Sequence, residues 1–335
     1  MTPSKTQARQ SIKGFTIISL MIAILLSSVL MAGLISVFSS NQNASRLMFD
    51  FGSLQEGVRT GNEILEVSLR QAGHFGGVKS ADISAHASLA ITGSGSCNKD
   101  WITDTSTPIR GFDGAAAIGS VSGLPNNCIA SDEYVAGTDV LSIKYASTMD
   151  MTSIGSVDGS NVYIRTIVGS SASTLGEIFK GSDGTTIGDA TDPVGTYNYR
   201  YASELYYVRA CSHKVDGACK DDVPSLVRFQ LDGTTFTEQL LVEGVEQFQV
   251  EFGIDADGNF TADNYLSPAS ITDWQRVVSV RYSLVVRGNS ADKTMLDTKT
   301  YTLAGEVNYT PTGDDQAYHR RAYTKVVQLR NMIRG

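Results

Sequence analysis

Hydrophobic residues are concentrated near the start of the chain, where an uncharged apolar run extends from Phe15 to Phe38. At roughly 24 residues and 1.5 Å per residue, this run can cross a bilayer core of about 30 Å as an α-helix. A short basic leader precedes it and ends at Gly14, whereas a secretory signal carries its small residues after the apolar segment. We therefore expect a leader over residues 1–14 and a membrane-embedded helix over residues 15–38.

The helical pattern continues beyond a polar patch. Apolar residues recur three, four or seven positions apart, at Leu47, Phe51, Leu54, Val58, Leu65 and Leu69. This spacing is typical of an amphipathic helix. Proline is absent from Thr16 to Gly73, and glycines then signal the helix end. We predict an amphipathic continuation of the helix over residues 39–73.

From about residue 80 the period changes. Residues 80–135 are rich in Gly, Ser, Asn and Asp and predict long loops. Strand-like segments follow, and two of them (245–254 and 277–287) alternate with the period of antiparallel strands that have one covered face. The expected strands are residues 140–145, 162–167, 205–210, 226–231, 245–254, 277–287, 303–309 and 323–329. The predicted fold class is α+β, with the long N-terminal helix packed on an antiparallel β-sheet head over residues 74–335.

Charge indicates which side of a membrane the head occupies. The 335-residue chain has a formal net charge of -8, and removing a leader with three basic residues and no acid leaves about -11. Such an acidic chain is poorly suited to non-specific nucleic-acid binding. The basic leader favours a cytoplasmic N-terminus, so the residues after Phe38 are expected across the inner membrane, in the periplasm.

Four cysteines lie in this exported part. Three pairings are possible, and proximity favours Cys97–Cys128 and Cys211–Cys219, which would persist in an oxidising periplasm. A zinc site is the competing use of four cysteines. It is disfavoured because no CxxC pair is present.

Several segments resemble known pilus proteins. The junction Gly14-Phe15-Thr16 resembles the class III leader of type IV prepilins, and later segments resemble the PilW family of minor type IV pilins: residues 69–76, 241–250, 278–287 and 320–331. The resemblance implies cleavage after Gly14 by prepilin peptidase and N-methylation of Phe15. It also implies a low-abundance subunit that acts with other minor pilins, the major pilin and the inner-membrane assembly platform. Such a subunit takes part in starting pilus assembly, in a tip complex, and ends in the pilus at the cell surface.

One residue departs from the family pattern. Type IV pilins carry a glutamate at the fifth mature position, where it pairs with the N-terminal amine of a neighbouring subunit, and Ser19 occupies that position here. A serine cannot form that pair. Two interpretations remain open, namely drift in a subunit needed in few copies, and a subunit at the fibre tip with no pilin above it.

Two other functions are compatible with these features. The first is a tip adhesin or DNA-uptake receptor that uses residues 80–240, and the second is a minor pseudopilin of a type II secretion system. No motif in the sequence indicates whether the fibre serves twitching motility, cell adhesion or competence. An enzyme is not expected, because the four histidines are scattered and no phosphate-binding loop is present.

A short acidic segment is a weak candidate for calcium. Asp255, Asp257, Asn259 and Asp263 offer oxygen ligands at alternating positions. An EF-hand loop would need glycine where Phe260 stands, and Asp-Gly followed by Asn favours a tight turn. We expect a turn here, and otherwise no cofactor.

Two further clusters have alternative interpretations. The C-terminal basic residues are either phosphate contacts for DNA or a solvated strand face: His319, Arg320, Arg321, Lys325, Arg330 and Arg334. Five tyrosines suit either a protein interface or an edge strand: Tyr197, Tyr199, Tyr201, Tyr206 and Tyr207.

Overall fold

The computed structural model describes residues 16–93, 97–131, 133–152, 157–167, 175–187, 196–292 and 294–332. The chain forms two compact units, which are considered separately below. The first ends at Gly52 and the second begins at Ser53.

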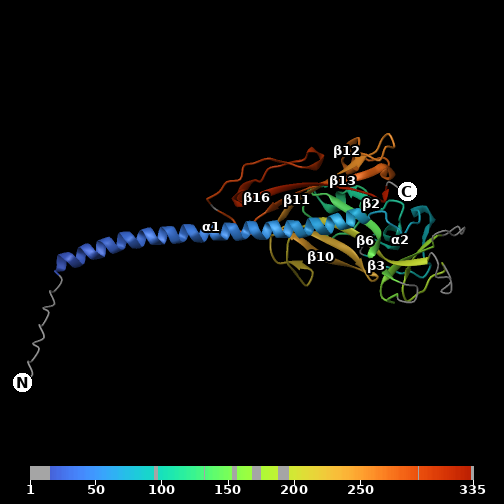
Figure 1. The fold of residues 1–335 in the computed structure, drawn as a ribbon, viewed down its shortest axis with the longest axis horizontal. Helices are drawn as coiled ribbons and strands as arrows, with labels where there is room; N and C mark the ends of the chain where they lie inside the picture. The colour runs from blue at the N-terminus through green and yellow to red at the C-terminus, as the bar shows by residue number, and fades with distance from the viewer. Residues whose placement is uncertain are drawn as a thin grey trace, which may run out of the picture. The chain divides into compact units, whose positions relative to one another are not determined.

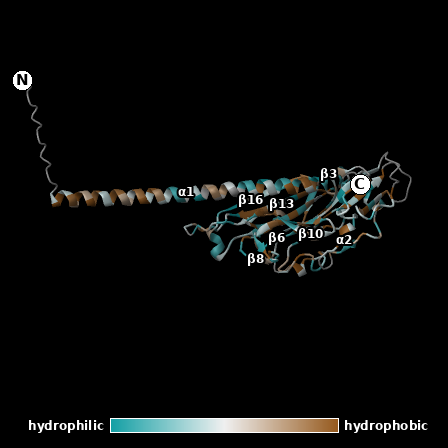
Figure 2. Ribbon diagram, turned by 90° about the horizontal axis from the view of Figure 1, so that it is seen from below, coloured by the Kyte–Doolittle hydropathy of each residue, from teal (hydrophilic) through white to brown (hydrophobic). Residues whose placement is uncertain are grey.

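One helix, α1 (Ile17–Gln71), contributes to both units and confirms the predicted helix (Figure 1). In the first unit its apolar side chains are exposed around the helix. Figure 2 shows that most of this stretch is coloured hydrophobic. The segment Ile17–Arg46 is long and apolar enough, by length and composition, to cross a membrane.

The second unit contains a large sheet. Its order is β1 (Ile83–Ala85), β5 (Gly176–Lys180), β4 (Val162–Ile167), β6 (Thr196–Arg209), β3 (Val140–Thr152) and β2 (Ile109–Phe112). The long strand β6 also pairs with β9 (Ser225–Asp232), which pairs with β10 (Thr235–Glu243). Every pairing in this sheet is antiparallel except that of β1 with β5, so the sheet is mostly antiparallel as predicted.

A second sheet has the order β12 (Asn264–Leu266), β11 (Val245–Ile254), β13 (Val277–Arg287) and β16 (Arg320–Gln328), all antiparallel. Two small hairpins pair β7 (Lys214–Val215) with β8 (Ala218–Cys219) and β14 (Tyr301–Thr302) with β15 (Asn308–Tyr309). The short helix α2 (Lys99–Thr103) precedes β2. Together these elements form an α+β head.

The strand predictions were confirmed for some segments and wrong for others. The expected bounds of 162–167, 245–254 and 277–287 are those of β4, β11 and β13. Residues 80–135 are not only loops, because they contain α2, β1 and β2. Residues 303–309 are not one continuous strand, and only Asn308–Tyr309 (β15) of this range is extended in a sheet. Gly305 adopts φ 73°, and a 3₁₀ turn over Ala304–Glu306 separates β14 from β15.

The prediction of a single covered face was also wrong. The second half of α1 covers one face of the β11–β13–β16 sheet, burying Leu65 and accepting a hydrogen bond from Tyr282 Oη at Asn62 Oδ1 (3.1 Å). The opposite face is covered by residues 288–319, where the N–H of Ala304 donates to Ser283 Oγ (3.1 Å). Polar side chains on that face are buried because the covering segment and β16 supply partners for them.

Close contacts fix α1 on the head. An ideal Cβ built at Gly61 would lie 2.1 Å from Cγ2 of Val242, so only glycine leaves room for this side chain. At the helix end, Asn331 Nδ2 donates to the carbonyls of Arg70 (3.0 Å) and Ala72 (3.4 Å). The last residues of the chain therefore cap the helix, whose final carbonyls have no partner within the helix.

Asp139 joins the two sheets. Its carboxylate accepts the N–H groups of Gly114 (2.8 Å) and Val250 (2.8 Å), and its own N–H donates to the carbonyl of Phe248 (2.8 Å). Burial raises the pKa of this carboxyl to about 7. Asp139 thus takes the place of a neighbouring strand at the edge of β11.

Candidate assembly site

The predicted processing residues Gly14 and Phe15 lie outside the described residues, which begin at Thr16. Cleavage after Gly14 and methylation of Phe15 therefore stay predictions.

The start of α1 is neutral. Ser19 Oγ donates to the carbonyl of Thr16 (2.7 Å), and the Ser19 N–H donates to Thr16 Oγ1 (3.3 Å). The first turn contains no acidic residue. Ser19 completes the local hydrogen bonding of the helix and offers no charge to an amine.

The first unit provides a continuous apolar surface. From Ile17 to Ser45 the helix contains no charged residue, and Ser28 Oγ donates to the carbonyl of Leu25 (2.8 Å) within the helix. A helix that is apolar all round requires lipid or other apolar helices around it. This surface is suited to a membrane and to lateral packing against similar helices.

Two disulfides brace the head. Cys97 is joined to Cys128 (Cα–Cα 5.1 Å) and Cys211 to Cys219 (Cα–Cα 5.6 Å), the pairs that sequence proximity favoured. The first lies in a hydrophobic core with Phe112 and contributes to packing as well as to connectivity.

The second disulfide closes a hairpin that a charge cluster holds to the head. Lys214 Nζ contacts Glu133 Oε1 (2.5 Å) and Glu238 Oε2 (3.0 Å), and Arg209 Nη1 also contacts Glu238 (3.0 Å). Tyr207 Oη donates to Glu238 as well. Sequence reasoning missed this cluster, because its members are dispersed over about a hundred residues. Its carboxylates are paired with cations, so it holds the hairpin in place.

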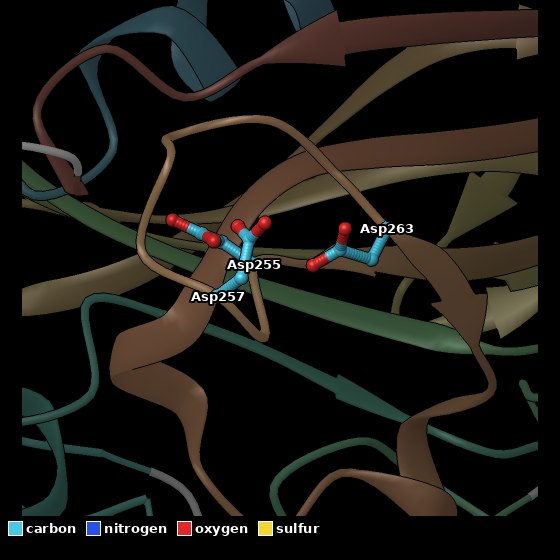
Figure 3. Close-up of side chains that lie close together, drawn as sticks. All are labelled: Asp255, Asp257 and Asp263. Atoms are coloured by element: carbon cyan, nitrogen blue, oxygen red, sulfur yellow. The ribbon is translucent and has the colours of Figure 1, made fainter.

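The weak calcium candidate is a compact acidic loop (Figure 3). The carboxylates of Asp255, Asp257 and Asp263 each offer an oxygen within 4.8 Å of the others. Asp255, however, already accepts the N–H groups of Gly258 (2.7 Å), Asn259 (3.2 Å) and Phe260 (2.8 Å). Burial opposes ionisation of Asp255, but these bonds outweigh it and keep the pKa of the carboxyl below its ordinary value.

The remaining ligands of the candidate are also engaged. Asp263 Oδ2 accepts the N–H of Ala256 (2.7 Å), and Asn259 Oδ1 accepts the N–H of Thr261 (2.8 Å). These bonds account for the loop as the expected turn without an ion. Calcium binding stays a prediction.

The C-terminal basic residues do not form one surface. Arg320 has a side chain that is 0% exposed, and it binds Glu246 through two nitrogens (2.5 and 2.8 Å). Lys325 pairs with Glu66 of α1. Arg321 and Arg330 are exposed, and Arg334 lies outside the described residues. Neither a solvated face nor a phosphate contact describes Arg320, because a buried arginine needs carboxylate partners inside the fold.

The tyrosine cluster was also misread. Strand β6 is central in its sheet, and Tyr201, Tyr206 and Tyr207 are buried, while Tyr197 is 41% exposed. Tyr201 Oη donates to the carbonyl of Ile102 (2.6 Å), which satisfies a hydroxyl that burial would otherwise leave costly. Internal partners for the hydroxyls make these residues part of the core.

An open cleft of about 500 Å³ lies between α1 and the large sheet. At its floor, Glu204 accepts the hydroxyls of Tyr145 (3.1 Å) and Tyr206 (2.8 Å) and pairs with Arg228 (3.0 Å). Burial and the nearby Glu204 charge raise the pKa of Tyr206. This tyrosine therefore stays neutral. Each side chain of the network has a hydrogen-bond or ion-pair partner within the fold, as in a polar core.

The comparisons with known proteins agree with the N-terminal and C-terminal features. Residues 205–331 match the family described as type IV pilus-assembly protein W (PilW), and residues 9–35 match the prokaryotic N-terminal methylation motif. No curated protein matches the chain. Among solved structures it is similar to a type IV-like pilin from Thermus thermophilus, with 9% identity and a TM-score of 0.35, over 83% of this chain and 96% of that one.

Proposed function

We propose that this chain is a minor pilin that helps to start pilus assembly. The proposal is supported by the match of residues 205–331 to the family of type IV pilus-assembly protein W (PilW) and of residues 9–35 to the prokaryotic N-terminal methylation motif. In this proposal the leader is removed after Gly14 and α1 holds the subunit in the inner membrane, with its head in the periplasm. The subunit then enters a tip complex with other minor pilins and ends at the cell surface.

The uncharged first half of α1 carries this proposal. Its apolar side chains are exposed on all sides, so lipid or other apolar helices can cover them. Ser19 supports a tip position, because a subunit with no pilin above it gains nothing from a carboxylate there. A buried unpaired carboxylate is costly in an apolar environment.

A deletion strain tests the assembly role. We expect loss of surface pili, measured by counting pili on cells and by the amount of major pilin in sheared fractions, with recovery on complementation. Cells that keep normal pili but lose adhesion or transformation would point to a receptor instead.

The tip position is tested with Ser19→Glu. We expect the number of copies of this subunit per purified pilus to stay unchanged or to fall. A clear rise, with copies along the shaft, would exclude the tip assignment.

A further inference from the structure

The loop between β11 and β12 presents an aromatic side chain from left-handed backbone. Phe260 has φ 66°, a region that bulky residues rarely adopt. The other non-glycine residues with positive φ in the described part of the chain are Asn127, Asp216 and Glu306, all polar. The Phe260 side chain is 53% exposed, so its own burial does not offset the backbone strain.

The backbone conformation of this loop does not depend on the Phe260 side chain. Asp255 binds three successive N–H groups from Gly258 to Phe260, and Asp263 binds the N–H of Ala256. The base of the loop is closed by β11 and by Arg276, whose carbonyl accepts the N–H of Asp255 (3.0 Å). The aromatic ring is therefore held out on a fixed support, and a preorganised group loses little conformational entropy when it binds.

The surroundings of the ring are acidic. Asp257 and Asp263 are exposed, and neither takes part in an ion pair within the part of the chain that the structure describes. Arg276 reaches the loop, where its Nη1 donates to the carbonyl of Ala256 (3.2 Å), but its ion-pair partner is Asp273 (3.5 Å). The loop thus offers one apolar projection beside two carboxylates that accept hydrogen bonds within the loop and keep their negative charge uncompensated by an ion pair among the described residues.

We propose that Phe260 is a docking anchor that inserts into an apolar pocket, rimmed by basic side chains, on another subunit of the pilus. An aromatic side chain that becomes buried at the centre of an interface typically supplies much of the binding energy. The flanking carboxylates select a basic rim and repel an acidic one. This inference rests on the proposed function, because the partner is taken to be a pilus subunit.

Phe260→Asn separates docking from folding. Asparagine tolerates positive φ, and the carboxylate bonds to the loop use backbone N–H groups that the substitution leaves in place. We expect the unfolding temperature of the full chain in detergent to rise by roughly 1–4 °C, while the amount of this subunit in sheared pili falls about tenfold. A residue with only a structural role would not gain stability as incorporation falls.

Leu296→Asn is the matched control. Leu296 is 69% exposed on another loop of the head and does not have positive φ. We expect this variant to be incorporated normally.

A photo-crosslinker identifies the partner. The full chain with p-benzoyl-phenylalanine at position 260, expressed in piliated cells, should form an adduct with another pilus subunit, and the same group at position 296 should not. Absence of an adduct at 260, equal adducts at both positions, or normal incorporation of Phe260→Asn would overturn the docking proposal. Normal pili in the deletion strain would instead overturn the proposed function.

Discussion

The two faces of the β11–β13–β16 sheet are covered in different ways. On the face where Tyr282 donates to Asn62 of α1, the sheet presents Phe248, Val250 and Leu284, which are fully or almost fully buried. On the opposite face, where Ser283 accepts the N–H of Ala304, it presents Gln249 and Glu251, which are also buried but polar. The same strands therefore contribute an apolar core on one side and a polar core on the other.

The difference shows that α1 and the segment on the opposite face stabilise the sheet in different ways. An apolar face gains free energy from any well-packed apolar cover. A face with carboxylates can be buried only under a cover that brings cations and hydrogen-bond donors in the right places. Here Tyr309 of the covering segment donates through Oη to Glu246 (3.0 Å), and Arg320 at the start of β16 binds the same carboxylate. The buried carboxylate thus favours a cover and an edge strand that both supply partners for it.

Breaking the polar face should have the largest effect. Arg320→Met leaves buried Asp297 without its cation and buried Glu246 with only the longer ion-pair contact to Arg287 (3.6 Å). We expect a loss of about 3–5 kcal/mol in the free energy of unfolding. Urea unfolding of the full chain in detergent measures it. Glu246→Gln combined with Arg320→Met should recover part of the loss, and exposed Arg321→Met should change little. Equal losses in the single and double variants would show that packing, not charge, holds this face.

Lys144 offers a contrast with Arg320, because it is a buried cation whose hydrogen-bond partners are carbonyls and not carboxylates. Its Nζ donates to the carbonyls of Trp101 (2.5 Å) and Asp104 (2.8 Å) and lies over the Trp101 ring. Burial lowers the pKa of Lys144 to about 8. The unfolded chain, with an ordinary lysine pKa near 10.5, binds more protons between these values, so stability should rise with pH across this window.

The expected gain from pH 8 to 10.5 is on the order of 2–3 kcal/mol. Lys144→Met should lack this rise, because it removes the titrating group. Urea unfolding at pH 8, 9 and 10 compares the two proteins, and parallel profiles would contradict the assignment.

The apolar face is tested at its closest contact. Gly61→Ala places a methyl against Val242, and we expect a loss of about 1–3 kcal/mol. Combining it with Val242→Ala should remove the clash. Gly52→Ala is the matched control on the same helix, because nothing lies within 4 Å of its added methyl, and it should be neutral or slightly stabilising.

The smallest effect is expected at the helix cap. Asn331→Ala removes the donor to the carbonyls of Arg70 and Ala72, at a cost of about 0.5–1.5 kcal/mol. Hydrogen exchange should become faster for amides in the last turn of α1 and stay unchanged around Val58. Uniformly faster exchange would instead indicate a global loss of stability.

The sequence predicted the elements whose apolar pattern matches their environment. Strands β4, β11 and β13 carry strong alternating or continuous apolar patterns, and their bounds were predicted correctly. Strand β5 was missed because Glu177 interrupts its apolar residues. In the structure Thr185 Oγ1 (2.6 Å) and the N–H of Thr186 (2.7 Å) donate to that carboxylate. The apolar pattern within a strand carries no information about such partners in the segment that follows it.

The candidate assembly site, like the strands, could be predicted only where its signal lies within one stretch of chain. Local signals identified the apolar run, the methylation motif and the cysteine proximity, because each lies within one stretch of chain. Arg320 and the buried tyrosines were misread for the opposite reason. Their environment depends on residues far away in sequence, such as Glu246 for Arg320 and Ile102 for Tyr201.

The cap on α1 also sets the order in which the molecule can be completed. Asn331 and Arg70 are 261 positions apart, so the end of α1 stays uncapped until the segment around Asn331 has been made and has folded onto it. Contacts between such distant residues form late and slow the search for the native state. A chain that stops before Asn331 would therefore keep the helix but lack the donor that caps its last carbonyls.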